Sequence, residues 1–221
     1  MSDNYMTRLF EFLGELRENN HRDWFNANKQ RYTLLREPWL ADLQRLIDLL
    51  THSRPELRGV TARDCAYRIY RDIRFKADKT PYKTYFSACI GPQGRKTMQS
   101  CIYLHFEPGN AGVYCGIWCP EPDKLRAIRA LIDADGDELQ RAIHDPQFAS
   151  LFRFMPFDKL KTAPKGYSVN HPHIDLLCAK DFTFGMPVPD SYFTQGDWVT
   201  RVADDLQHTL QVERFLNYVY E

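Results

Sequence analysis

The sequence lacks the excess of one charge sign that bulk binding to DNA or to anionic lipid requires. Its 221 residues contain 29 Lys and Arg against 29 Asp and Glu, so the formal net charge is zero. Any contact with nucleic acid would therefore need a local basic patch. The sequence also lacks an apolar run long enough to span a membrane and a secretory signal at its start. These absences predict a cytoplasmic protein that does not associate with membranes.

The short motifs of several large enzyme classes are missing as well. There is no G-x-G-x-x-G fingerprint, no Walker lysine loop, no H-E-x-x-H and no G-x-S-x-G. Their absence argues against a Rossmann oxidoreductase, a P-loop NTPase, a zincin and an α/β-hydrolase. The six cysteines include no Cys-x-x-Cys pair, so reduced thiols are expected rather than a zinc site. We therefore expect no metal site and no cofactor.

Composition and patterning favour one compact α+β domain that covers residues 1–221. The chain is 43% hydrophobic and 14% aromatic, which is typical of a globular fold. Apolar residues recur at helical spacing in an N-terminal helical cap, 4–52, and again in a C-terminal helical part, 121–221. In the stretch 65–119, segments in which apolar and polar residues alternate are separated by Gly/Pro turns, which predicts strands. The expected sheet is an antiparallel meander of about four to five strands, flanked by the two helical parts.

Some local features refine this prediction. Asn20 is suited to cap a helix that begins after it. Pro38 is expected to interrupt that helix and to begin another. Residues 182–189 are expected to be extended and could add an edge strand to the sheet.

Residues 68–85 form a locally basic segment in an otherwise neutral chain. Between Tyr67 and Phe75 apolar and polar residues alternate with period two, which predicts a strand with one buried face. Arg71 falls on the apolar side of this pattern. A guanidinium cannot lose its proton, so a bulge, a carboxylate or a bound anion must accommodate it. The charged residues of the segment are Arg68, Arg71, Asp72, Arg74, Lys76, Asp78, Lys79 and Lys83.

Three polar clusters could together form an anion site. Arginine forks, ammonium groups and amide donors are the groups that bind phosphate or carboxylate. The alternative is three solvated surface loops, since basic runs are often solvated edges. The clusters are Asn20, Arg22, Asn28 and Lys29, then Arg71, Arg74, Lys79 and Lys83, and finally Lys161, Lys165 and His171.

Several stretches resemble a family of conserved hypothetical proteins, the domain of unknown function numbered 2461. The most specific motif is Arg71-Asp72-x-Arg74-Phe75-x-x-Asp78-Lys79-Thr80-Pro81-Tyr82-Lys83-Thr84. Other matching stretches begin at Asn19, Trp118 and Leu160 and extend the resemblance over most of the chain. The resemblance implies a small soluble bacterial-type protein and assigns no activity or catalytic residue. The chain departs from the pattern at residues 113–116, where more glycine is expected.

The sequence thus supports two functional hypotheses of different classes. The first is a site for a phosphorylated or carboxylated small molecule, in which Tyr82 orients the ligand and His171 is the candidate proton donor. Whether such a site also catalyses a reaction is left open. The alternative is a module for single-stranded nucleic acid, which neutral net charge disfavours, and a protein-interaction scaffold is a second alternative. Predicted anion ligands are Arg71, Arg74, Lys79, Tyr82, Lys83 and Lys165, with Arg22, Asn28, Lys29, Asp72 and Asp78 as contributors.

Overall fold

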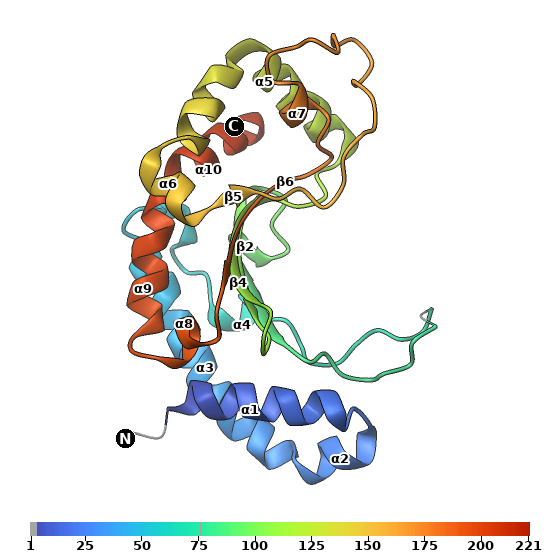
Figure 1. Cartoon of the computed structure of the whole chain (residues 1–221). Helices are drawn as coiled ribbons and strands as arrows, with labels where there is room; N and C mark the ends of the chain where they lie inside the picture. The colour runs from blue at the N-terminus through green and yellow to red at the C-terminus, as the bar shows by residue number, and fades with distance from the viewer. Residues whose placement is uncertain (1–3, 76) are drawn as a thin grey trace. The chain divides into compact units, whose positions relative to one another are not determined.

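A computed structural model describes residues 4–75 and 77–221 of the chain. Lys76, one of the charges of the basic segment, lies outside the described residues. The expected α+β class is confirmed, because helices flank an open five-stranded antiparallel sheet within the described part of the chain (Figure 1). No helix in this part of the chain combines the length and the apolar character that a membrane crossing demands.

The helices are concentrated before and after the main strands. In the N-terminal part they are α1 (Tyr5–Glu18), α2 (Arg22–Ala27), α3 (Lys29–Leu50), the 3₁₀ turn η1 (Pro55–Leu57) and α4 (Ala62–Cys65). Those that follow the first four strands are α5 (Pro122–Ile143), α6 (Pro146–Leu151), α7 (Ile174–Leu177), α8 (Ser191–Thr194), α9 (Trp198–Asp205), η2 (Leu206–Thr209), α10 (Leu210–Asn217) and η3 (Tyr218–Tyr220).

The sheet has the strand order β1-β3-β4-β6-β5. Its strands are β1 (Phe86–Ile90), β3 (Cys101–Phe106), β4 (Ala111–Ile117), β5 (Arg153–Phe154) and β6 (Phe182–Val188), and the short β2 (Pro92–Arg95) lies outside this order. The extended segment predicted at 182–189 is β6, which has β4 on one side and β5 on the other. It is therefore an interior strand rather than an edge strand. The first five residues of β6 are all buried, as expected of a strand with two neighbours.

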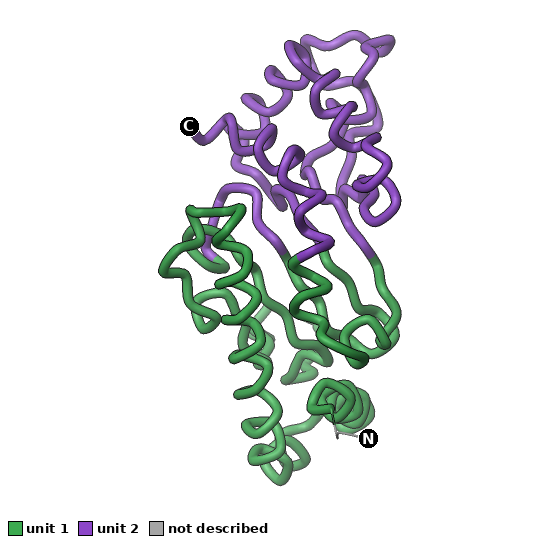
Figure 2. Tube along the Cα trace, turned by 90° about the vertical axis from the view of Figure 1, so that its left-hand side faces the viewer, with its two compact units in different colours: residues 1–95, 103–113, 187–203 green, residues 96–102, 114–186, 204–221 purple. Residues whose placement is uncertain are grey.

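The chain groups into two compact units, which Figure 2 colours separately. The first unit comprises the chain up to Arg95 together with Tyr103–Val113 and Pro187–Ala203. The second unit comprises Lys96–Ile102, Tyr114–Met186 and Asp204–Glu221. The expectation of one compact domain over 1–221 stays a prediction.

The cap of α1 follows the usual rule, whereas two predictions for the next helices are wrong. Asn4 caps α1, because its side chain accepts a hydrogen bond from the backbone N–H of Met6. The prediction for Asn20 is wrong, since His21 caps α2. Pro38 does not interrupt a helix or begin another, because it lies inside α3. A proline leaves the carbonyl four residues earlier without its helical donor, and Leu34 at that position is exposed to water.

Aromatic rings fill the core of the first unit. Trp39 of α3 is almost fully buried and meets Phe86 and Phe106 edge-on, at centroid distances of 5.0 and 5.8 Å. Phe106 also contacts Phe193 and Trp198. Such aromatic pairs add about 0.5–1.5 kcal/mol beyond the burial of their area.

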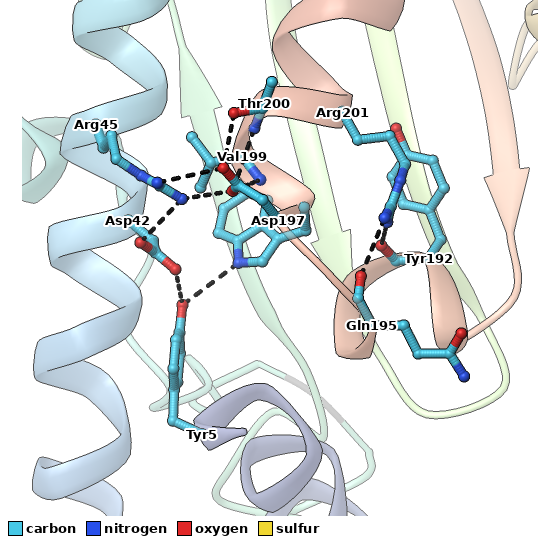
Figure 3. A network of polar contacts seen from close by, with 10 residues as sticks. Tyr5, Asp42, Arg45, Tyr192, Gln195, Asp197, Val199, Thr200 and Arg201 are labelled. Atoms are coloured by element: carbon cyan, nitrogen blue, oxygen red, sulfur yellow. Dashed lines mark hydrogen bonds and ion pairs between the residues drawn. The ribbon is translucent and has the colours of Figure 1, made fainter. Parts of the chain in front are cut away.

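A polar network at the edge of this core joins three helices (Figure 3). The Tyr5 hydroxyl on α1 donates to Asp42 of α3 at 2.6 Å and accepts from the Trp198 indole at 3.4 Å. Arg45, one turn after Asp42, donates to Asp197 at 2.6 Å. Burial, reinforced by the Asp42 carboxylate, raises the pKa of Tyr5 far above its usual value. The phenol therefore stays protonated and holds the helices together.

The second unit has its own aromatic core. Phe148 of α6 stacks on Phe152 and meets Phe184 of β6 edge-on at 5.7 Å. Phe154 of β5 lies 5.1 Å from Phe184. Helix α5, which opens at Pro122 as its sequence predicts, packs against α10.

Candidate functional site: a basic pocket

The first unit contains a pocket of about 610 Å³ whose lining is strongly basic. We call it the basic pocket. Among the described residues that line it, the single carboxylate is that of Asp72, which forms an ion pair with Arg74, a residue outside the lining. The remaining charges are therefore cations in excess. The lining residues are Arg36, Arg63, Ala66, Tyr67, Arg68, Tyr70, Asp72, Lys83 and Arg95.

Backbone pairing within the basic segment builds one wall of this pocket. Tyr70 and Tyr82 form an antiparallel bridge, and the backbone N–H of Lys83 donates to the carbonyl of Ile69 at 2.8 Å. The two stretches run side by side and lead away from β1 (Figure 1). This pairing places Lys83 beside the residues that follow Arg68 in the chain.

The pairing is irregular next to Lys83. A second antiparallel bridge joins Ala66 to Ala88. Between the two bridges the chain advances four positions on the side of Ala66 and six on the side of Ala88. The extra residues form a bulge, the kind of irregularity that re-aims side chains next to functional sites. Tyr85 lies in this bulge, and Lys83, whose backbone still pairs with Ile69, comes just before it.

Asn20 holds the bulged stretch from the opposite side. Its side-chain amide donates to the Tyr82 carbonyl at 3.0 Å, and its oxygen accepts from the Tyr82 N–H at 3.1 Å. One side chain thus satisfies both backbone groups of Tyr82, as a neighbouring strand would. The Tyr82 ring stacks on Phe25 of α2 with centroids 4.0 Å apart. These contacts fix Tyr82, the residue before Lys83, against α2.

Lys83 has an unusual environment for a lysine. Its ammonium nitrogen lies 5.0 Å from the ring centre of Tyr67 and 5.6 Å from that of Tyr85. Burial, and then the positive charge of Arg68, lower the pKa of Lys83. Within residues 4–75 and 77–221, no carboxylate forms an ion pair with the side chain of Lys83 or of Arg68, although the charge of Arg68 contributes to the lowered pKa of Asp72.

Arg95 forms the base of the pocket at the end of α4. One guanidinium nitrogen donates to the carbonyls of Arg63 and Asp64 at 3.1 and 2.8 Å. Gly94 before it has φ +58, and a Cβ there would lie 2.7 Å from the Asp64 carbonyl oxygen. Only glycine allows this approach, which sets the position of Arg95. Arg63 contacts Glu37 at 3.9 Å in an exposed pair, the kind that contributes little stability.

The arginines predicted as anion ligands have internal partners instead. Arg71 donates to the Asp78 carboxylate at 2.6 Å, so a carboxylate accommodates the guanidinium that the alternation placed on the apolar side. Arg74 donates to Asp72 at 2.7 Å, and Lys79 donates to the carbonyl of Ile73 at 3.0 Å. Neither arginine lines the basic pocket, and neither does Lys79.

The two carboxylates of this loop are strongly acidic. Hydrogen bonds from Arg74 lower the pKa of Asp72 to about 2. Hydrogen bonds from Thr80, and then from Arg71, lower the pKa of Asp78 further still. Both groups stay ionised at neutral pH, which makes them poor proton acceptors.

The strand predicted between Tyr67 and Phe75 is wrong, because Tyr70 forms an isolated bridge and no residue of this stretch belongs to a strand. Residues 72–75 belong to no strand, and Phe75, expected on the buried face, is 94% exposed. The pairing ends because the hydrogen bonds of Asp72 and Asp78 turn the chain locally.

The other predicted contributors lie outside the basic pocket. Tyr82 is only 4% exposed and belongs to the core against Phe25. Asn28 uses its side chain to bond the Trp24 carbonyl at 2.9 Å, at the junction of α2 and α3. Arg22 and Lys29 are exposed at the first positions of α2 and α3. Their roles in ligand binding stay predictions.

His171 lines a second concavity, of about 450 Å³, in the second unit. We call it the acidic cleft. The His171 Nδ1 accepts from the His173 backbone N–H at 3.0 Å, so Nε2 carries the proton and donates to Asp133 at 3.0 Å. Both ring nitrogens are thus occupied. Lys165 is exposed and does not line the cleft, whose lining is Asp133, Ala134, Asp135, Gly136, Asp137, Glu138, Arg141, His171, Pro172 and His173.

His173 also contacts the kinked part of α5. Its Nε2 lies 3.2 Å from Asp137, and its ring packs on Gly136, where a Cβ would lie 2.4 Å from Cδ2. Asp135 has non-helical φ/ψ angles of −132° and 25°. No group of three or more His, Cys, Asp or Glu in the described part of the chain is arranged to hold a metal ion. The histidines of the cleft therefore join the 160–173 loop to α5.

Sequence reasoning missed three arginines of the basic pocket: Arg36, Arg63 and Arg95. They come from α3, α4 and β2, which lie outside the basic segment. Each has acidic neighbours in the sequence or lies in a turn, so no local charge run marks it. Arg68 was part of the basic segment, but the alternation placed it on the same polar side as Arg74 and did not distinguish the two.

The fold and the pocket together define an α+β protein with a basic concavity between a bulged hairpin and the helical cap of its first unit. The chain belongs to the family of conserved hypothetical proteins designated DUF2461, whose model matches residues 8–215. This confirms the resemblance seen in the sequence motifs. No curated protein and no solved structure matches the chain.

Proposed function

We propose that the basic pocket binds a small molecule that carries a phosphate or carboxylate group. The observation that carries this proposal is the pairing pattern of its charges. Arg71 and Arg74 have carboxylate partners, whereas Arg68 and Lys83 line the pocket without one among the described residues. Neighbouring cations that repel one another are stabilised by a bound anion.

The chemistry of the lining fits such a ligand. Arg68 supplies a planar fork that matches two anion oxygens, and Lys83 supplies a compact ammonium group. Tyr67 and Tyr70 add aromatic surface, and Tyr70 is 46% exposed. The pocket volume of about 610 Å³ lies within the range of small-molecule sites.

Thermal unfolding with added inorganic phosphate, pyrophosphate and citrate tests the proposal. A ligand at a hundred times its dissociation constant adds about 2.7 kcal/mol of stability. We expect Arg68→Gln to reduce this stabilisation strongly. Arg58→Gln removes the same charge from an exposed position outside the pocket and serves as the matched control. Equal stabilisation of both variants, or none of the wild type, would contradict the proposal.

A single-stranded nucleic acid is the second candidate ligand, because one observation favours it. Phe75 is 94% exposed, and the Arg74 guanidinium lies 6.0 Å from its ring centre. An exposed aromatic ring beside a cation can stack on a base while the cation contacts a phosphate. Fluorescence anisotropy with a labelled oligonucleotide should then show binding that weakens steeply with salt and is lost in Phe75→Ala. Binding that ignores salt would exclude this candidate.

A further inference from the structure

Lys83 differs from an ordinary phosphate-binding lysine in how it is held. Its nitrogen lies against the faces of Tyr67 and Tyr85, and its backbone is held by the pairing with Ile69, next to Tyr82, which Asn20 bonds. The amine thus lines a concave site at a fixed place. An exposed lysine such as Lys161 has no comparable surroundings.

Two opposing effects act on the charge of this amine. The tyrosine rings favour the ammonium form through cation–π attraction. Burial and the nearby Arg68 favour the neutral form, and they prevail, because the pKa of Lys83 is lowered. A lysine that is desolvated beside another cation is the usual form of an activated amine nucleophile. The titratable and charged groups that line the pocket with it, together with the ring of Tyr85 at its nitrogen, are Arg36, Arg63, Tyr67, Arg68, Tyr70, Asp72, Tyr85 and Arg95.

We propose that Lys83 is a reactive amine that forms an imine with a carbonyl compound bearing a phosphate or carboxylate group, which Arg68 holds. The inference rests on the proposed anion site and specifies its ligand class. An anionic aldehyde or ketone would place its charge on Arg68 and its carbonyl carbon at the Lys83 nitrogen.

The covalent step is a simple condensation. The lone pair of the neutral Lys83 nitrogen attacks the carbonyl carbon, and the electrons of the C=O double bond move to oxygen. The resulting carbinolamine loses its oxygen as water, which carries away the two hydrogens of the amine. A C=N bond remains between Lys83 and the ligand. No electron is gained or lost, so no redox partner is needed.

The test is site-specific trapping on the intact chain. The protein is incubated with pyridoxal 5′-phosphate or with pyridoxal, the imine is reduced with borohydride, and modified lysines are located by peptide mass spectrometry. We expect Lys83 to be modified at least about threefold faster than Lys161 at pH 7, since the neutral fraction of an amine rises about tenfold per unit of lowered pKa. We also expect the phosphorylated aldehyde to react faster than pyridoxal, and inorganic phosphate to protect Lys83.

Three variants sharpen the result. Arg68→Gln removes the charge that both disfavours the ammonium form and holds the anion, so Lys83 should lose its advantage over Lys161. Arg58→Gln should leave that advantage unchanged. Lys83→Arg keeps the positive charge and should abolish modification at this position, with thermal unfolding as the check on folding. If Lys83→Arg does not fold, the sites of modification in the wild type and in Arg68→Gln still show whether Lys83 is the reactive lysine.

The possible outcomes separate this inference from the anion site itself. Modification of Lys83 no faster than Lys161 would overturn the inference, even if phosphate stabilises the protein. Fast modification by both aldehydes alike, without protection by phosphate, would contradict the anion site and support only the reactive amine. Fast modification that prefers the phosphorylated aldehyde supports both.

Discussion

The basic pocket and the acidic cleft are opposite solutions for charged side chains on one chain. In the acidic cleft each histidine faces an aspartate, His171 with Asp133 and His173 with Asp137. In the basic pocket Arg68 and Lys83 face one another and two tyrosines. Four carboxylates and one arginine line the cleft, so it has an excess of negative charge, whereas the described lining of the pocket has an excess of cations. The histidine–aspartate contacts of the cleft join a loop to a helix, whereas the neighbouring cations of the pocket repel one another.

The first prediction compares a close-packed glycine next to each site, Gly94 beside the basic pocket and Gly136 in the acidic cleft. Gly94→Ala should cost about 3 kcal/mol or more, because φ is positive there and the new Cβ meets backbone atoms of Asp64. Gly136→Ala should cost less, about 1–2 kcal/mol, since the obstacle is the His173 side chain, which can shift. Urea unfolding measures both free energies.

Gly14→Ala is the control for these glycine substitutions. Gly14 lies within α1 and has open space around a new Cβ. This change should stabilise the protein by about 0.5–1 kcal/mol through helix propensity. A loss at Gly136 as large as that at Gly94 would show that the cleft is built as rigidly as the pocket wall.

The second prediction concerns the two hydrogen bonds by which Asn20 holds the Tyr82 backbone, which we call the Asn20 clamp. Asn20→Ala removes both hydrogen bonds to the Tyr82 backbone, which is buried with its ring against Phe25. The expected loss is about 1–3 kcal/mol, the cost of leaving such groups unsatisfied. Phosphate binding should weaken as well, because the clamp positions Lys83. Asn26→Ala, at an exposed position of α2, should change neither quantity and serves as the control.

The third prediction concerns the charge on Lys83 and its dependence on pH. The pKa of Lys83 is lowered in the folded state, so the unfolded chain binds this proton more tightly. The resulting loss of stability is fully present below the folded pKa. It disappears as the pH rises through that value toward the ordinary lysine pKa of about 10.4.

Lys83→Met removes this cost together with the favourable cation–π contacts. At pH 7 we expect a gain of under about 1 kcal/mol, because the side chain is only half-buried and solvent screens its charge. The difference in unfolding free energy between the two proteins should narrow as the pH approaches 10. A constant difference over this range would mean that Lys83 is an ordinary surface ammonium.

The smallest effect is expected outside both sites. Arg74→Ala breaks the exposed pair with Asp72, and exposed pairs of this kind are screened by water and salt. The urea midpoint should stay within its measurement error. A clear loss of stability would show that the 72–79 loop contributes to folding, contrary to the exposure of Phe75 at its centre.

The sequence predicted those features that depend on neighbouring residues. Apolar residues at helical spacing predicted the two helical parts, and the Gly/Pro turns predicted the strands between them. Predictions failed where a residue's partner is distant. Asn20 has the chemistry of a helix cap but bonds Tyr82, and Pro38 is tolerated inside α3 because water can reach the carbonyl it leaves unbonded.

The same distinction applies to the candidate site. The basic segment, Lys83 and the need of Arg71 for a partner were all evident from residue types and period. The partner itself, Asp78, was one of several possibilities that only the local turn decides. Arg36, Arg63 and Arg95 join the pocket from separate elements, so no pattern in the chain could bring them together.

The sequence by itself determined the α+β class, the family and the presence of a basic segment, because local spacing and motif carry that information. Tertiary structure alone decided which cations are neutralised and which line a pocket. Charge pairing depends on distances of a few ångströms that local turns set, and the lining of the pocket depends on how separate elements pack, and the sequence contains neither directly.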